Sequence, residues 1–209
     1  MKKVFLATAL SIAMLTSFAQ NNVSVGPHAG FGHAWISGTD ADNRYKPSGT
    51  FGLQVVYSAI GNFGIGGNLS YSIEGASAKT GSLKYTTRLN YIRIPITAMY
   101  FFRQFGDRVR PKVSIGPSVG FLVGGEQDFN GTIVEDVDDD YKKLDFGIYT
   151  TGGVHVRLLP GTWLTIDMNY YHGLSDVTEQ ADKNKNRNIG VNAGLLFGLT
   201  KYRERDRRY

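Results

Sequence analysis

The residues best suited to chemistry are few in this chain and are spread along it. The sequence holds four histidines, His28, His33, His155 and His172, and no cysteine. The lack of cysteine excludes a thiol nucleophile, a zinc–thiolate site and a disulfide framework. His28 and His33 have opposite parity in one alternating segment, so they point to opposite faces of a strand. These histidines predict no metal site and no catalytic centre, and we expect no cofactor.

The acidic segment 126–140 is the next candidate for a site. Asp136, Asp138 and Asp140 match the D-x-D-x-D start of a calcium-binding loop. Such a loop needs glycine at its sixth position and glutamate at its twelfth. Those positions hold Tyr141 and Gly147 here. We therefore interpret the segment as a solvated acidic loop, and a looser divalent-cation site is the alternative.

Charged residues that lie among small polar residues are more informative. Glu74, Arg88, Arg93, Asp145 and Asp167 all take the polar positions of alternating segments. In a narrow barrel these side chains would share the interior, where an unpaired charge is costly. The sequence therefore predicts a lumen charge network in which Arg88 and Arg93 pair with Glu74, Asp145 and Asp167. We expect a structural role for it, and an ion or proton path is the alternative.

The elements that must position these residues are strands. Apolar and polar residues alternate with period two, which is typical of strands with two different faces. Eight segments show this pattern: 23–35, 50–58, 63–74, 89–100, 112–123, 143–156, 163–171 and 188–199. The apolar phase changes near Tyr91 and Ile92, which predicts a β-bulge. After the N-terminal segment no run of eighteen apolar residues occurs, so no helical membrane span is predicted.

The connections between these segments alternate in length. Segments 37–47, 75–83, 125–141 and 173–187 are long and polar, whereas 60–62 and 159–161 are tight. Long loops on one side and short turns on the other are typical of bacterial outer membrane barrels. The predicted fold is all-β, an eight-stranded antiparallel transmembrane β-barrel with up-and-down order. An even strand number places both chain ends on the periplasmic side.

The composition of the two faces decides which one points outward. The polar face is rich in Gly, Ser, Asn and Thr, which suits the crowded lumen of a small barrel. Aromatic residues gather at the ends of the apolar stripes, as in the interface girdles of membrane barrels; they are Trp35, Tyr57, Phe63, Tyr71, Tyr85, Tyr100, Phe101, Phe102 and Tyr170. We expect Trp35, Tyr57, Tyr71, Tyr100 and Tyr170 to be interface aromatics. A soluble exported barrel of the lipocalin type, binding an apolar ligand, is the alternative.

Both ends of the chain differ from the rest. Lys2 and Lys3 precede an apolar run, and Ser17 and Ala19 are small residues before a cut at Gln20. This layout predicts a signal peptide over 1–19, a barrel domain over 20–200 and a basic periplasmic tail over 201–209. The net charge of +5 includes Lys2 and Lys3. A charge this modest does not indicate a nucleic-acid partner.

Several segments together resemble a known family. They are the Tyr91–Ile96 strand running to Phe102, residues 116–120, residues 144–154, residues 167–174 and residues 188–194. The chain is similar over about 22–200 to the PorT-like small outer membrane β-barrel proteins of the Bacteroidetes type. It departs from them at Arg93, where an acidic residue is common, and in the nine residues that follow the last strand. The resemblance implies the outer membrane, and a terminal aromatic, here Tyr209, that barrel assembly machinery reads.

The resemblance and the alternation together favour a non-enzymatic scaffold that presents its long loops outside the cell. We expect a monomer in outer membrane lipid with a role in adhesion, envelope integrity or a secretion complex, and an envelope protein as a partner. A barrel enzyme is the alternative from another class. Its catalytic residues would have to come from the loop end, where His172, Ser175 and Asp176 are close in sequence.

Overall fold

The computed structural model describes residues 23–38, 43–44, 46–58, 61–80, 83–104, 107–129, 132–136, 140–178 and 184–199. The predicted signal peptide over 1–19 and the basic tail over 201–209 lie outside these residues. In the described part of the chain, no helix is long and apolar enough to cross a membrane.

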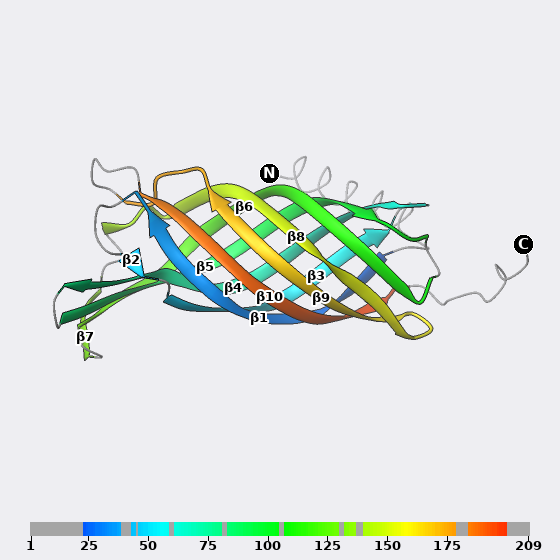
Figure 1. Ribbon diagram of the computed structural model, residues 1–209, viewed down its shortest axis with the longest axis horizontal. Coiled ribbons are helices and arrows are strands. Elements are labelled where there is room, and N and C mark those ends of the chain that lie inside the picture. Colours follow the sequence, from blue (N-terminus) through cyan, green and yellow to red (C-terminus); the bar gives the residue numbers. More distant parts are fainter. Residues whose placement is uncertain are drawn as a thin grey trace, which may run out of the picture.

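Eight long strands form a closed antiparallel barrel (Figure 1). They are β1 (Val23–Ser37), β3 (Lys46–Ser58), β4 (Phe63–Thr80), β5 (Leu83–Phe101), β6 (Val109–Phe129), β8 (Leu144–Leu159), β9 (Thr162–Gly173) and β10 (Lys185–Gly198). Each long strand pairs with the next one along the chain, and β1 pairs with β10 to close the ring. The predicted eight-stranded barrel is confirmed. Two short strands, β2 (Asn43–Arg44) and β7 (Thr132–Asp136), add to β4 and β6.

The two faces of the barrel wall are opposite in character to those of a soluble barrel. Large apolar side chains such as Phe31, Leu53 and Met168 are exposed on the outside, Phe31 by 75%. Inward positions between them hold buried polar residues such as Gln54, Ser70 and Asn169. A lipocalin-type barrel buries its apolar face inward. The described residues therefore do not support the soluble alternative.

Three neighbouring strands are much longer than a membrane requires. β4, β5 and β6 have 18, 19 and 21 residues, whereas a tilted strand crosses a bilayer in about 9–11. Their far ends form, with β2 and β7 at the two edges, a projecting sheet made of residues 43–44, 75–80, 83–88, 125–129 and 132–136. Figure 1 shows it at the left end of the barrel.

The projecting sheet corrects the predicted loops. The segments 75–83 and 125–141 were expected to be loops, but pairing continues through Ser77 and Thr86 to the β4–β5 turn, and β7 lies within the second segment. The segments 37–47 and 173–187 are also shortened, because β3 begins at Lys46 and β10 at Lys185. When a hairpin extends into water, pairing between its strands satisfies the backbone N–H and C=O groups, and neither face has to be hydrophobic. The extension therefore leaves no alternation of apolar and polar residues by which the sequence could predict it.

The predicted bulge has a counterpart in the β5–β6 register. Asn90 pairs with Gly124 but Tyr91 pairs with Leu122, so the additional residue is Val123 of β6. β5 itself alternates without a break, and Leu89 and Tyr91 face the interior with Arg93. The change of apolar phase therefore reflects apolar residues inside the barrel and not a bulge in β5.

Two apolar clusters inside the barrel account for these residues. The loop-end cluster consists of Ile36, Ala76, Leu89, Tyr91, Leu122 and Val177. The turn-end cluster consists of Val56, Met99, Phe101, Trp163 and Leu196. Phe101 was expected among the exterior aromatics, and this is wrong. Neighbours in a strand face opposite sides, and since Tyr100 points outward, Phe101 is fully buried inside.

Candidate functional site

The polar layer between the two apolar clusters centres on Arg93 of β5. Its Nε and Nη2 atoms each lie 2.7 Å from a carboxylate oxygen of Glu74 on β4, and Nη2 also donates to Asp145 Oδ2 of β8 at 2.9 Å. Arg93 is 5% exposed and both carboxylates are fully buried. The guanidinium carbon lies 3.9 Å from the ring centre of Tyr171. An arginine held by two acids and an aromatic face is fixed in direction as well as in charge.

Two further residues complete this arrangement, which we call the central cluster. Asn186 of β10 donates to Glu74 and to Asp145. Lys46 of β3 donates to the Glu74 carbonyl at 2.9 Å and is buried. The cluster thus contains two bases and two acids and is neutral overall. Neutrality matters because the cost of burying an uncompensated charge exceeds that of a paired one.

The structure brings together three of the five residues of the predicted lumen charge network. Glu74, Arg93 and Asp145 meet in the central cluster. Asp167 instead pairs with Lys112, at 2.7 Å, closer to the turn end. Arg88 lies in the projecting sheet, where it contacts Glu126 at 3.0 Å and Asp128 at 3.5 Å.

Sequence reasoning missed several interior residues. Lys46 and Arg110 are almost fully buried, yet both lay outside the segments that alternated clearly. Arg110 donates to Ser58 Oγ at 3.3 Å and lies 3.8 Å from the Phe101 ring centre. Lys84 and Lys143, which also take polar positions in the sequence, are exposed. The parity of a residue within its strand was the available signal, and it fails where the strand ends are misplaced.

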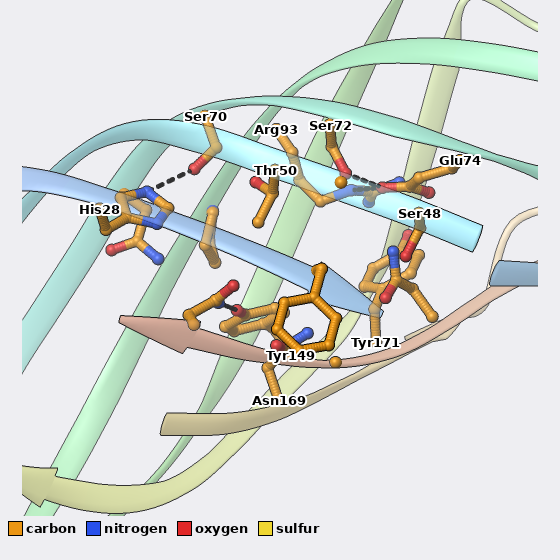
Figure 2. Close-up of a pocket in the computed structure, with 17 residues that line it drawn as sticks. His28, Ser48, Thr50, Ser70, Ser72, Glu74, Arg93, Tyr149, Asn169 and Tyr171 are labelled. Atoms are coloured by element: carbon orange, nitrogen blue, oxygen red, sulfur yellow. Dashed lines mark hydrogen bonds and ion pairs between the residues drawn. The ribbon is translucent and has the colours of Figure 1, made fainter. Parts of the chain in front are cut away.

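A cavity beside Glu74 and Arg93 of the central cluster extends to His28 and Ser70 (Figure 2). A second cavity, which shares His28 and Tyr149 with the first, reaches the Lys112–Asp167 pair. His28 of β1 bonds Ser70 of β4 at 3.0 Å across the first cavity. Asn192 donates to the Tyr149 hydroxyl at 3.2 Å. The lining contains hydroxyls, amides, the imidazoles of His28 and His155, and the charged side chains of the central cluster and of the Lys112–Asp167 pair, so it can order water or small polar groups.

Glycine makes room for the large side chains of this layer. A Cβ atom on Gly147 of β8 would lie 2.7 Å from ring atoms of Tyr171 and 2.4 Å from the His172 carbonyl oxygen. A Cβ on Gly152 of the same strand would meet nothing within 4 Å. Gly147 is therefore required for Tyr171 to lie under Arg93, whereas Gly152 is not.

The three residues considered for catalysis each have a separate partner. His172 Nδ1 bonds the Tyr170 hydroxyl at 3.3 Å. Ser175 donates to Asp145 Oδ1 at 3.1 Å. Asp176 accepts from Lys142 Nζ at 3.1 Å and from the Asn184 backbone N–H at 3.1 Å. Within the described residues, no hydrogen bond joins the three into a relay.

The environment of Asp176 is that of a structural carboxylate. Partial burial by itself raises the pKa of this group, but hydrogen bonds from Lys142, from Asn184 and from the backbone and hydroxyl of Thr178 outweigh it and lower the pKa. The side chain thereby ties the segment after β9 to the segment before β8 and to the start of β10.

The acidic segment 126–140 is only partly covered by the structure. Of its three aspartates in alternate positions, Asp138 lies outside the described residues. Among the residues that are described, no group of three or more histidine or acidic side chains converges in a way that could hold a metal ion.

The predicted interface aromatics lie at two levels on the outside of the wall. Tyr57 and Tyr100 are near the turn end, where Tyr100 contacts Phe63 with ring centres 5.4 Å apart. Tyr71 contacts Phe51 at 5.4 Å, and Trp35 contacts Tyr170 at 6.4 Å, both toward the loop end. Phe63 and Tyr71 are eight residues apart on β4, which is about 26 Å along a strand.

Comparison with known proteins agrees with this geometry. A family model described as an outer membrane protein beta-barrel domain matches residues 18–179. No curated protein matches the chain by sequence. Among solved structures, Neisserial surface protein A is similar with a TM-score of 0.52 at 16% identity, covering 84% of this chain and 97% of that one. The outer membrane protein OprG from Pseudomonas aeruginosa has a TM-score of 0.52 at 9% identity, with 86% and 97% covered. At these identities the structures share the fold.

Proposed function

The chain belongs to the outer membrane protein beta-barrel domain family, and on this basis we propose that it is a closed, non-enzymatic scaffold that holds the projecting sheet outside the cell for contact with another envelope protein. The protein is an outer membrane β-barrel with apolar side chains toward lipid. Its distinctive feature is the projecting sheet, which extends beyond the length of strand that a membrane requires.

The projecting sheet is the observation that carries the proposal. β4 and β5 continue as a paired hairpin to Thr80 and Leu83, and β2 and β7 widen it at both sides. Tyr85 contacts Phe129 across β5 and β6 with ring centres 5.0 Å apart. A sheet with such contacts holds its surface in a fixed shape, and binding residues gather on segments positioned by a rigid support.

The orientation follows the rule for bacterial barrels. Short turns such as Leu159–Thr162 lie on the periplasmic side and long connections lie outside the cell. We place the projecting sheet outside accordingly, with a signal peptide over 1–19 that is removed on export and the tail over 201–209 in the periplasm. Trp35, Tyr71 and Tyr170 then lie at the outer interface, and Tyr57 and Tyr100 at the inner one.

The finer assignment is to the PorT-like type, in which some members serve a secretion machinery. The Tyr91–Ile96 strand and the other similar segments support it, although Arg93 stands where an acidic residue is common in that type. We propose that the protein acts as a monomer in outer membrane lipid, inserted by barrel assembly machinery. A partner would be an envelope protein that recognises the projecting sheet.

The test is recovery of that partner with and without the outer end of the β4–β5 hairpin, which is the tip of the projecting sheet. Ser77 and Thr86 are directly paired, with their hydroxyls 3.2 Å apart, so residues 78–85 can be replaced by Asn-Gly, a two-residue turn that suits a hairpin. After cross-linking in membranes, wild-type protein should co-purify with a partner that the shortened variant loses. A heat-dependent gel shift checks that the variant is folded. Equal recovery with both proteins would contradict the proposal.

A further inference from the structure

Basic residues gather on the outer surface of the barrel at its loop end. The outward basic patch consists of His33 and Trp35 of β1, Lys185 and Arg187 of β10, and Tyr170 and His172 of β9. None of these residues belongs to the lumen or to the projecting sheet. The patch holds two permanent cations and two imidazoles beside two aromatic rings.

The inward neighbours of these residues fix their direction. Ala34 and Ile36 are buried inside, so Trp35 points outward on β1. Asn186 contacts Glu74 in the central cluster, which places Lys185 and Arg187 on the outer face of β10. Tyr171 lies against Arg93, which places Tyr170 and His172 on the outer face of β9.

The strand register brings the six residues together. Arg187 is directly opposite Trp35 on one side and His172 on the other. His33 is opposite Ile189, which is in turn opposite Tyr170. Trp35 and Tyr170 contact each other, and Arg187 Nη1 donates to the Gly173 carbonyl at 3.0 Å. Cross-strand neighbours of this kind lie about 4.5–5.5 Å apart, so the charges form one surface.

The level of the patch matches the headgroups of the outer leaflet. Toward the turn end, the outward positions are apolar, with Phe31 on β1, Met168 on β9 and Val191 on β10. Trp35 and Tyr170 follow, as expected where the hydrocarbon ends. Lys185, Arg187 and His172 lie at that level or beyond it, where lipid headgroups are found.

The charge of this surface has one sign. On the described lengths of β1, β9 and β10, no outward position holds Asp or Glu. The acids of the neighbouring lumen, Glu74 and Asp145, are on the other side of the wall and are paired with Arg93. Phosphate groups are strong acceptors for Lys and Arg, and aromatic rings pack against the sugar or acyl part of a lipid.

We propose that the outward basic patch is a binding site for a phosphorylated lipid of the outer leaflet, with Lys185 and Arg187 holding phosphate and Trp35 and Tyr170 packing on the adjoining part of the lipid. The inference rests on the outer membrane location and is independent of the proposed scaffold function. The ligand class is a phosphoglycolipid of the lipid A kind.

The test uses the refolded full chain in detergent with doubly phosphorylated lipid A as the probe. Native mass spectrometry measures the bound fraction for wild type, for K185Q/R187Q and for the control R103Q/R108Q. The control removes the same charge from exposed residues at the turn end. One base near an anionic surface contributes about fivefold in affinity, so the first variant should bind about 25-fold more weakly. The control should stay within twofold of wild type.

Three outcomes would overturn the proposal. The first is an equal loss of lipid A binding in K185Q/R187Q and in the control, which indicates an effect of net charge alone. The second is equal binding of lipid A from which the phosphates have been removed. The third is displacement of lipid A by millimolar inorganic phosphate, which indicates a site for a free anion. The heat-dependent gel shift shows that each variant is folded. Because the assay contains no partner protein, its result does not depend on the scaffold proposal.

Discussion

Arg93 and Glu74 are joined by two hydrogen bonds of 2.7 Å that run side by side from Nε and Nη2 to the two carboxylate oxygens. The pair spans adjacent strands near the middle of the lumen, and Asp145 and Asn186 add contacts from the opposite wall. The strands β4, β5, β8 and β10 are thereby connected through the Arg93–Glu74 pair. The pair is a structural centre, and its geometry leaves little room for passage.

Replacing Arg93 by alanine should destabilise the barrel strongly. The change leaves two buried carboxylates without their cation, which costs about 3–5 kcal/mol. Urea unfolding of the refolded protein in detergent, followed by the gel shift, measures the loss. The matched control is Arg88→Ala, because Arg88 pairs with two acids but is 38% exposed; there we expect about 1 kcal/mol or less.

The charge argument has its own check in a combined variant. R93M and K46M together with E74Q and D145N remove both bases and both acids of the central cluster at once, so no buried charge of the cluster is left without a partner. Its stability should recover most of the loss seen in Arg93→Ala, since well-packed neutral groups can replace a buried ion cluster. A combined variant as unstable as Arg93→Ala would show that packing of the guanidinium against Tyr171, and not charge, is what matters.

The Gly147 prediction compares two glycines of one strand. Gly147→Ala should destabilise the barrel by about 1–3 kcal/mol, because the new methyl group overlaps the Tyr171 ring and the His172 carbonyl. Gly152→Ala should have little effect, because the space around it is open. Unfolding midpoints of the two variants under the same conditions decide the matter. Equal midpoints would mean that Tyr171 can move aside at no cost.

Much of this fold could be predicted from the sequence. Alternation placed eight strands, and the glycine-rich face pointed inward, because both depend on side-chain parity, which the sequence carries directly. Tyr71 and Tyr170 fell on the outward face for the same reason. The length of β4, β5 and β6 beyond the membrane could not be predicted, because backbone pairing in water leaves no apolar pattern.

The pairing of charges was harder to predict than their direction. Arg93 and Asp145 meet because both are opposite Gly120 of β6, and Glu74 reaches Arg93 because it follows Ser70, the partner of Arg93, on the inward face of β4. Registers between strands are not visible in one sequence. Arg88 was grouped with them by parity alone, although the register aligns it with Glu126. Lys46 falls in the segment 37–47 that the sequence predicts as a loop, but it begins β3 and is the second buried base of the central cluster.

Acid should release the contacts of Asp176 before the barrel itself unfolds. Because the folded-state pKa of Asp176 is lowered below its ordinary value of 3.8, its carboxylate stabilises the fold above that value. This stabilisation is lost as the pH falls through the lowered pKa. Amide resonances of Thr178 and Asn184, recorded by NMR in micelles between neutral pH and about pH 2, should shift together in that range.

The Asp176→Asn variant is the control for this titration. It keeps the shape of the side chain but cannot change charge, so its Thr178 and Asn184 resonances should show no transition of this kind. A wild-type transition centred above 3.8, or one that persists in the variant, would contradict the assignment of Asp176 as the titrating group.

The closed lumen predicts that the protein does not conduct ions. A path along the axis would cross the loop-end cluster, the central cluster and the turn-end cluster in turn, and each of the two apolar clusters excludes water and ions. Purified protein in planar bilayers should therefore give no large, stable conductance. Trp163→Ala with Phe101→Ala opens the turn-end cluster alone, and it too should stay silent, because Leu89, Tyr91 and the Arg93–Glu74 pair remain. A stable conductance in wild type would refute the closed lumen, while one in the double variant alone would identify the turn-end cluster as its seal.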